Sequence, residues 1–123
     1  MFTIREEQRV VNNILIVDDN PGMRRLIKSV VEDLALAVHE CRDGAEALEA
    51  YEKISPEWVL MDIEMKEKDG ITATREIKEA HPEARVVILT KYCSARVREE
   101  AKRAGALEFI LKENLLSVRD LIY

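Results

Sequence analysis

Polar side chains stand at the ends of successive apolar runs in this sequence, where a buried strand has no use for them. Asp18 and Asp19 follow ILIV, Asp62 follows WVLM, Thr90 ends RVVILT and Lys112 ends LEFILK. Carboxylates that lie close together are unfavourable unless a cation neutralises them or a proton is taken up. Carboxylate oxygens suit Mg²⁺, and a hydroxyl and an ammonium beside them can bind a phosphoryl group. The residue types therefore predict a metal-dependent phosphoryl site whose nucleophile is a carboxylate, which can become an acyl phosphate.

These residues can meet only if the elements that carry them end at one place. The predicted strands cover 14–19, 35–41, 58–64, 85–90 and 107–112. Continuous aliphatic composition is typical of strands buried on both faces, and helical periodicity follows each of them. Strands that alternate with helices form a parallel sheet with helices on both faces. The fold class is therefore α/β, a doubly wound parallel sheet whose strand C-termini share one edge, where sites form in such folds.

Capping residues mark where the predicted helices begin and end. Asn20 precedes Pro21, a favoured first helical residue, and Asp43 has the cap position of a capping box. Gly105 follows a charged segment at the position where helices commonly end. A last amphipathic helix is predicted over 114–123. The connections between strands and helices are short.

Composition and charge limit the classes of function. The chain has 123 residues, of which 47% are hydrophobic and 35% charged, and this is the composition of a globular protein. Residues 1–11 predict a short N-terminal arm and residues 12–123 one domain. A net charge of −5 without a basic cluster argues against direct binding of nucleic acid or of an anionic membrane. The absence of a signal peptide and of any membrane-spanning run predicts a cytoplasmic protein, with Cys41 and Cys93 as free thiols.

Four stretches carry a resemblance to a known family. ILIVDDNPGMRRLI, VLMDIEMKEKDGI, VVILT and GALEFILK resemble, in this order and spacing, the signature stretches of the response-regulator receiver domain of two-component signalling. The resemblance covers about residues 13–122 and implies a flavodoxin-like, five-stranded sheet with strand order 2-1-3-4-5. PEARVVILT and GALEFILKEN are similar to receivers attached to helix-turn-helix transcription factors.

The resemblance implies a role for each acid. Asp62 becomes the phosphoacceptor. Asp18 and Asp19 become the acidic pair that holds Mg²⁺ together with Asp62, and the backbone carbonyl of Glu64 becomes a further ligand. This would explain why two negative charges stand at the end of a buried strand.

The resemblance also assigns the remaining polar residues. Thr90 would contact the phosphoryl oxygens and shift toward them, and Lys112 would pair with the phosphoryl group, or with Asp62 before transfer. Phe109 has the position of an aromatic switch whose rotamer follows Thr90. Phosphorylation would then change the face formed by the fourth helix, the fifth strand and the fifth helix.

The implied function is phosphorelay signal transduction. A sensor histidine kinase or phosphotransfer protein would donate the phosphoryl group to Asp62, and the domain would catalyse only its own phosphorylation and dephosphorylation, with no dedicated substrate turnover. An output domain or a separate target protein would receive the signal. Homodimerisation through the last helices is left open.

Three positions depart from the pattern of the family. Lys66 stands where proline is frequent, so the loop after Asp62 lacks a rigid turn. Lys91 replaces a small residue after Thr90, where a long cation could shield the acyl phosphate from water or crowd a partner. Glu113 replaces a proline after Lys112, and a trans peptide bond is expected there because a cis bond before glutamate costs about 3–4 kcal/mol.

Three other functions use similar features. A phosphatase of the aspartyl-phosphate type also has a strand-end aspartate, but DIEMK supplies only Glu64 of the segment expected after it. A flavin carrier needs a Ser/Thr/Gly-rich phosphate loop, and DDNPGM would repel a phosphate in the absence of a metal ion. A receiver-like interaction module that is never phosphorylated would lose some of the acids, the threonine or the lysine. All these positions are intact, which favours phosphorylation and leaves this module as the alternative.

Overall fold

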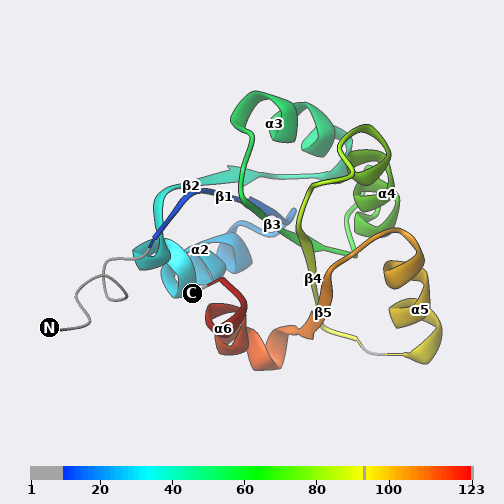
Figure 1. Ribbon diagram of the computed structural model, residues 1–123. Coiled ribbons are helices and arrows are strands. Elements are labelled where there is room, and N and C mark those ends of the chain that lie inside the picture. The colour runs from blue at the N-terminus through cyan, green and yellow to red at the C-terminus, as the bar shows by residue number, and fades with distance from the viewer. Residues whose placement is uncertain (1–9, 93, 123) are drawn as a thin grey trace, which may run out of the picture.

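Five parallel strands form one sheet in the computed structural model, which describes residues 10–92 and 94–122. The strand order is β2-β1-β3-β4-β5 (Figure 1), which confirms the doubly wound, flavodoxin-like α/β fold. The strands are β1 (Val11–Val17), β2 (Ala35–Cys41), β3 (Trp58–Asp62), β4 (Val86–Thr90) and β5 (Glu108–Leu111). Residues 1–9 of the predicted arm and Cys93 lie outside the described residues. The division into arm and domain stays a prediction, although β1 begins at Val11, earlier than expected.

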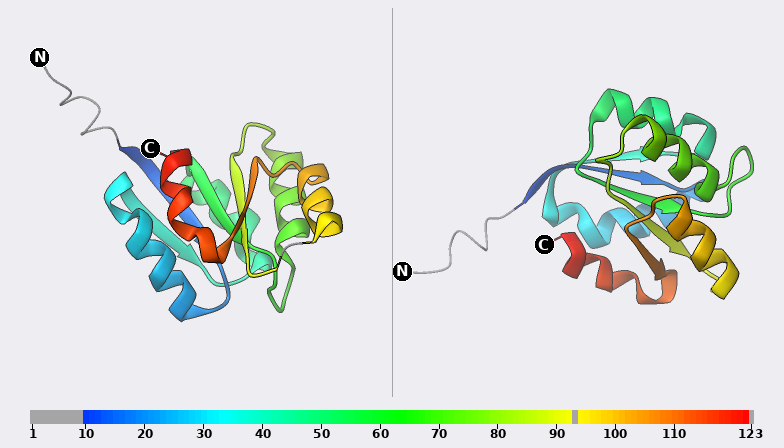
Figure 2. Two further views of the ribbon diagram at one scale, coloured as in Figure 1. Left: turned by 90° about the horizontal axis from the view of Figure 1, so that it is seen from below. Right: turned by 45° about the vertical axis from the view of Figure 1, so that its right-hand side comes forward.

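Helices cover both faces of the sheet, with α3, α4 and α5 on one face and α2 and α6 on the other (Figure 2). The α-helices are α2 (Pro21–Val31), α3 (Ala47–Ile54), α4 (Gly70–Ala80), α5 (Ala95–Arg103) and α6 (Val118–Ile122). Short 3-10 helices precede or follow them at η1 (Glu32–Leu34), η2 (Gly44–Glu46) and η3 (Lys112–Ser117). Among the described residues, no helix combines the length and the apolar character needed to cross a membrane.

The predicted capping residues act as expected. The side chain of Asn20 accepts a hydrogen bond from the backbone N–H of Met23 at 2.9 Å, and Asp43 caps η2 in the same way. Gly105 has a φ of +103°, the left-handed conformation that ends α5. The last helix, predicted over 114–123, is present with a different start: Asn114 has non-helical φ and ψ, the residues up to Ser117 form 3-10 turns, and α6 covers Val118–Ile122. Lys112 lies before this kink, directly after β5, and Val118 and Ile122 of α6 pack in the core after it.

Alternating side chains of the strands build two hydrophobic clusters. Ile14 and Ile16 point to the face covered by α2 and α6, whereas Leu15 and Val17 point to the face covered by α3 and α4. All four side chains are fully buried. Burial of each such side chain stabilises the fold by about 1.5–3 kcal/mol, so the strands form a rigid frame for the residues at their ends.

Candidate active site

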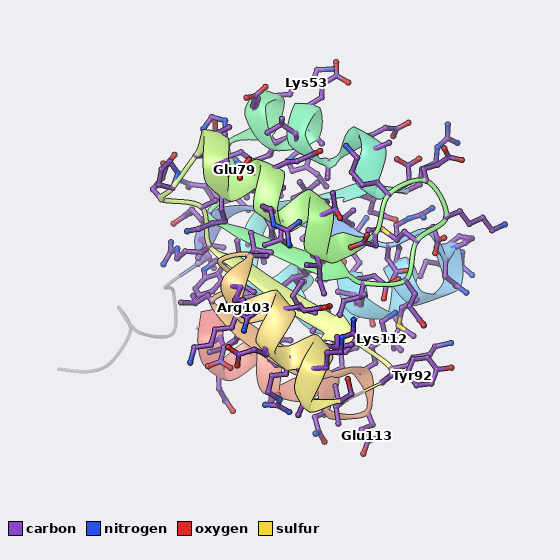
Figure 3. The ribbon with its side chains drawn as sticks, turned by 90° about the vertical axis from the view of Figure 1, so that its right-hand side faces the viewer. Lys53, Glu79, Tyr92, Arg103, Lys112 and Glu113 are labelled. Atoms are coloured by element: carbon purple, nitrogen blue, oxygen red, sulfur yellow. The ribbon has the colours of Figure 1, made fainter. Side chains whose placement is uncertain are left out.

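The polar residues singled out in the sequence lie at one edge of the sheet, where the parallel strands end. Asp62 and Thr90 are the last residues of β3 and β4, whereas Asp18 and Lys112 directly follow β1 and β5. In the view of Figure 3, Lys112 lies apart from Arg103, the last residue of α5. Helices therefore begin at the edge that carries the polar residues, where their N–H dipoles favour anions.

Three carboxylates converge at this edge. Asp18, Asp19 and Asp62 each offer one oxygen within 4.8 Å of the others. Asp18 and Asp62 are buried, and they border a hollow of about 110 Å³ that Glu64 also lines. Hard carboxylate oxygens beside a small hollow fit a divalent cation such as Mg²⁺, which keeps some of its waters. The structure thus brings together all four residues that the sequence predicted as metal ligands.

Lys112 bridges two of the three acids. Its Nζ lies 3.0 Å from Oδ2 of Asp18 and 3.0 Å from Oδ1 of Asp62. Burial is the largest single influence and acts to lower the pKa of Lys112, but the hydrogen bonds and the negative charges of the two carboxylates together outweigh burial and raise the pKa above its usual value. Lys112 is therefore an ammonium at neutral pH and partly neutralises the acids.

Asp62 has a perturbed carboxyl group. Burial raises the pKa of Asp62 to about 6, the hydrogen bond from Lys112 opposes this rise, and the negative charges of Asp18 and Asp19 add to it. Only the ionised form can act as a nucleophile toward phosphorus. A divalent cation beside Asp62 would favour the ionised carboxylate, as the Lys112 ammonium does.

The backbone after β3 contributes a contact that the sequence did not predict. The N–H of Lys66 donates to Oδ2 of Asp19 over 3.3 Å, so the loop in which Lys66 replaces the frequent proline touches the acid cluster. Lys91 is exposed and lines the same hollow, and its effect on the acyl phosphate stays a prediction. Glu113 is exposed, and the peptide bond before it is trans.

Thr90 and Phe109 lie on neighbouring strands. In the ladder Asp62 pairs with Leu89, so Thr90 lies one residue beyond Asp62 on the adjacent strand, and its buried hydroxyl accepts from the N–H of Tyr92 at 3.3 Å. Phe109 pairs with Ile88 and is half-buried, with the guanidinium of Arg98 at 5.0 Å from its ring centroid. β4 therefore connects Thr90, at the acid cluster, to Phe109 and Arg98 on the face made by β5 and α5. The switching role of Phe109 stays a prediction.

Gly70 is a site residue that the sequence indicated only as part of a turn. A Cβ at this position would lie 1.9 Å from the carbonyl oxygen of Asp62 and 2.8 Å from its carbonyl carbon. The N–H of Gly70 donates to the carbonyl of Ile63 at 2.9 Å, which folds the start of α4 onto the end of β3. The absence of a side chain is what allows this close approach.

We expect Gly70→Ala to lower the free energy of unfolding by about 3 kcal/mol, because the backbone of Asp62 cannot yield as a flexible side chain would. The matched control is Gly22→Ala, whose added Cβ would meet its nearest heavy atom, in the Asn20 side chain, at 3.3 Å. Its effect should stay within about 0.5 kcal/mol. Urea unfolding of both variants measures these changes in the free energy of unfolding. Equal effects of the two substitutions would contradict the close approach at Gly70.

This combination defines the class of protein. Receiver domains have an open parallel sheet in the order 2-1-3-4-5, with paired acids, a strand-end aspartate and a lysine at one edge, and this chain has the same arrangement. The family model described as response regulator receiver domain matches residues 14–121. The chain belongs to this family of two-component signalling proteins. Receiver domains typically bind Mg²⁺ at an acidic pocket and interact with histidine kinases or phosphotransfer proteins and with output domains.

Two relatives show the range of proteins that contain this domain. The chain is 41% identical over 104 residues to the chemotaxis protein CheY of Bacillus subtilis (strain 168), covering 84% of this chain and 87% of that protein. It is 35% identical over 102 residues to the regulatory protein AtoC of Escherichia coli (strain K12), covering 83% of this chain and 22% of AtoC.

Solved structures show the same fold. A two-component response regulator of the LuxR family from Aurantimonas sp. SI85-9A1 has a TM-score of 0.84 at 28% identity, over 89% of this chain and 81% of that chain. The response regulator domain of Thermotoga maritima CheB has a TM-score of 0.77 at 31% identity, over 91% and 88% of the two chains.

Proposed function

We propose that this receiver domain accepts a phosphoryl group on Asp62 from the phosphohistidine of a sensor histidine kinase or phosphotransfer protein, in a Mg²⁺-dependent reaction. The observation that carries this proposal is the convergence of Asp18, Asp19 and Asp62 within 4.8 Å, with the Lys112 ammonium 3.0 Å from Asp62. A cytoplasmic location, a downstream output domain or target protein, and a homodimer are proposals that accompany this function.

The reaction follows from the groups at the strand ends. An ionised oxygen of Asp62 attacks phosphorus and forms an O–P bond, while the N–P bond of the phosphohistidine breaks and the released imidazole nitrogen takes a proton from water. The Lys112 ammonium pairs with the phosphoryl oxygens as negative charge moves from Asp62. The Thr90 hydroxyl can donate to one of these oxygens. Mg²⁺, held by Asp18, Asp19, Asp62 and the Glu64 carbonyl, would supply charge neutralisation of the phosphoryl group.

Intact-mass spectrometry after incubation with acetyl phosphate tests the proposal. We expect the mass to increase by one phosphoryl group in the presence of Mg²⁺ and to stay unchanged with excess EDTA. A protein that stays unmodified by acetyl phosphate and by a panel of phosphorylated histidine kinases would instead be an interaction module that keeps the fold without the phosphoryl transfer.

We further propose that phosphorylation changes the face made by α5, β5 and the segment from η3 to α6. Support comes from β4, which carries Thr90 at the site and pairs with β5 at Phe109. A shift of the Thr90 hydroxyl toward a phosphoryl oxygen leaves space that an aromatic side chain on the neighbouring strand can fill. The Phe109 ring would then move relative to the Arg98 guanidinium.

Fluorine NMR can follow this movement because the chain contains only two phenylalanines, Phe2 and Phe109. Both phenylalanines are replaced by 4-fluorophenylalanine, which gives two fluorine resonances. The resonance of Phe109 is identified as the one that disappears in the Phe109→Leu variant. We expect this resonance to shift on phosphorylation, since a ring beside a cation has a different environment from one that has moved away. In Thr90→Ala the adduct should still form but the shift should be reduced. An unchanged Phe109 resonance in a phosphorylated protein would contradict the switch.

A further inference from the structure

The loop that carries Asp18 and Asp19 is held by residues that are not part of the acid cluster. Asp18 itself has several partners: its N–H donates to the carbonyl of Cys41 at 3.1 Å, and its carboxylate accepts from the N–H of Asn20 and from Lys112. The carboxylate of Asp19 accepts only the long 3.3 Å hydrogen bond from Lys66 among the bonds found in the described chain. The position of the Asp19 carboxylate therefore depends mainly on the backbone before it.

Arg24 fixes that backbone. Its Nη1 donates to the carbonyl oxygen of Asp18 at 2.7 Å. This carbonyl belongs to the planar peptide unit that joins Asp18 to Asp19, so a hydrogen bond to its oxygen sets the direction in which the chain enters Asp19. Hydrogen bonds from a charged donor are shorter and stronger than neutral ones.

Arg24 is itself fixed at two further points. It lies in the first turn of α2, where its N–H donates to the carbonyl of Asn20 at 2.9 Å. Its Nε lies 3.0 Å from Oε1 of Glu40, and only 17% of the Arg24 side chain is exposed. Glu40 pairs with Ile16 in the β1–β2 ladder, so the guanidinium connects the loop to the rigid sheet.

The charge of Arg24 acts differently from that of Lys112. Lys112 binds two of the carboxylates directly, whereas the Arg24 hydrogen bonds found here go to a backbone carbonyl and to Glu40, outside the acid cluster. Its planar group presents donors in a fixed geometry that lysine lacks. Arg24 can therefore orient the loop and offset part of its negative charge without occupying the position of a cation.

We propose that Arg24 is a positioning residue for divalent-cation binding, and that it acts by orienting the Asp18–Asp19 peptide unit from its anchor on Glu40. This inference rests on the proposed Mg²⁺-dependent function. Groups that orient the ligands of a metal ion commonly change metal affinity by an order of magnitude when they are removed.

Isothermal titration calorimetry with MgCl₂ tests this inference without phosphorylation. We expect Arg24→Gln to weaken Mg²⁺ binding by about tenfold. The matched control is Arg25→Gln, which removes the same charge from the exposed neighbour on α2 and should leave the affinity close to that of the wild type. Arg24→Lys should lie between the wild type and Arg24→Gln, because one ammonium cannot reproduce both guanidinium contacts. Urea unfolding in EDTA reports the stability of each variant separately.

Glu40→Gln removes the anchor of Arg24 and leaves the guanidinium in place. This variant tests the role of Arg24 even if Arg24→Gln fails to fold. We expect it to weaken Mg²⁺ binding in the same direction but less than Arg24→Gln. A Glu40→Gln or Arg24→Gln protein that folds and binds Mg²⁺ as tightly as Arg25→Gln would overturn the role of Arg24 but not the proposed function. A wild-type protein that binds no Mg²⁺ would overturn the proposed function as well, so the two failures are distinguishable.

Discussion

Asp62→Asn is expected to abolish the phosphoryl adduct and, in EDTA at neutral pH, to raise the free energy of unfolding by about 1–3 kcal/mol. The loss of the adduct follows because an amide oxygen is a poor nucleophile toward phosphorus. The gain in stability follows because an ionised Asp62 is buried beside two other acids. Function and stability are therefore opposed at this residue.

The pH dependence of this gain follows from the raised pKa of Asp62. The folded protein binds the proton with a pKa of about 6, above the ordinary value of 3.8, because burial and the neighbouring acids disfavour the charged form. The favourable contribution of the protonated group is complete below about pH 4 and is lost as the pH rises through about 6. The stability difference between Asp62→Asn and the wild type should thus be small at pH 4 and largest above pH 6.

Urea unfolding of both proteins across this pH range, together with intact-mass spectrometry after acetyl phosphate, measures both effects. Asp69→Asn is a useful control, since Asp69 caps α4 and lies outside the acid cluster. A mass increase in Asp62→Asn equal to that of the wild type would show that another residue is the acceptor. A stability difference that does not change with pH would contradict the perturbed carboxyl group.

Lys112→Met is expected to lower the free energy of unfolding in EDTA at neutral pH by about 3–5 kcal/mol. The side chain is 9% exposed and its ammonium lies 3.0 Å from each of two buried carboxylates. Removing it leaves these acids without their cation. Because the acids raise the pKa of Lys112 in the folded protein, its contribution is fully present at neutral pH and is lost only as the pH rises through that raised pKa.

The matched control for Lys112→Met is Lys91→Met, which removes an exposed ammonium from the edge of the same hollow. It should change the stability by no more than about 0.5 kcal/mol. Mg²⁺ should restore part of the stability of Lys112→Met, because the cation neutralises the same carboxylates. Thermal and urea unfolding with Mg²⁺ or EDTA test these expectations. Equal losses in the two lysine variants would refute the bridging role of Lys112.

Much of this site was accessible from the sequence because its residues stand at the ends of strongly patterned elements. A continuous aliphatic run such as ILIV predicts a buried strand, and the cap at Asn20 predicts the helix that follows it. Parallel strands end at the same edge, and the strand order places the end of β1, with Asp18, beside the end of β3, with Asp62, whereas Lys112 follows β5, two strands from β3. The last helix was predicted from its periodicity, but the non-helical backbone at Asn114 and the 3-10 geometry up to Ser117 were not, because local periodicity does not encode them.

By itself the sequence determined the class of fold, the family and the set of acids and hydroxyl at the strand ends, since these depend on residue type and short-range spacing. Only the tertiary structure decided which groups share partners: Lys112 binds both Asp18 and Asp62, Gly70 lies against the backbone of Asp62, and Arg24 joins the Asp18 carbonyl to Glu40. These contacts join segments that are distant in the chain or lie on different elements. Their distances depend on strand register and on helix packing, which arise from burial of the two hydrophobic clusters as a whole.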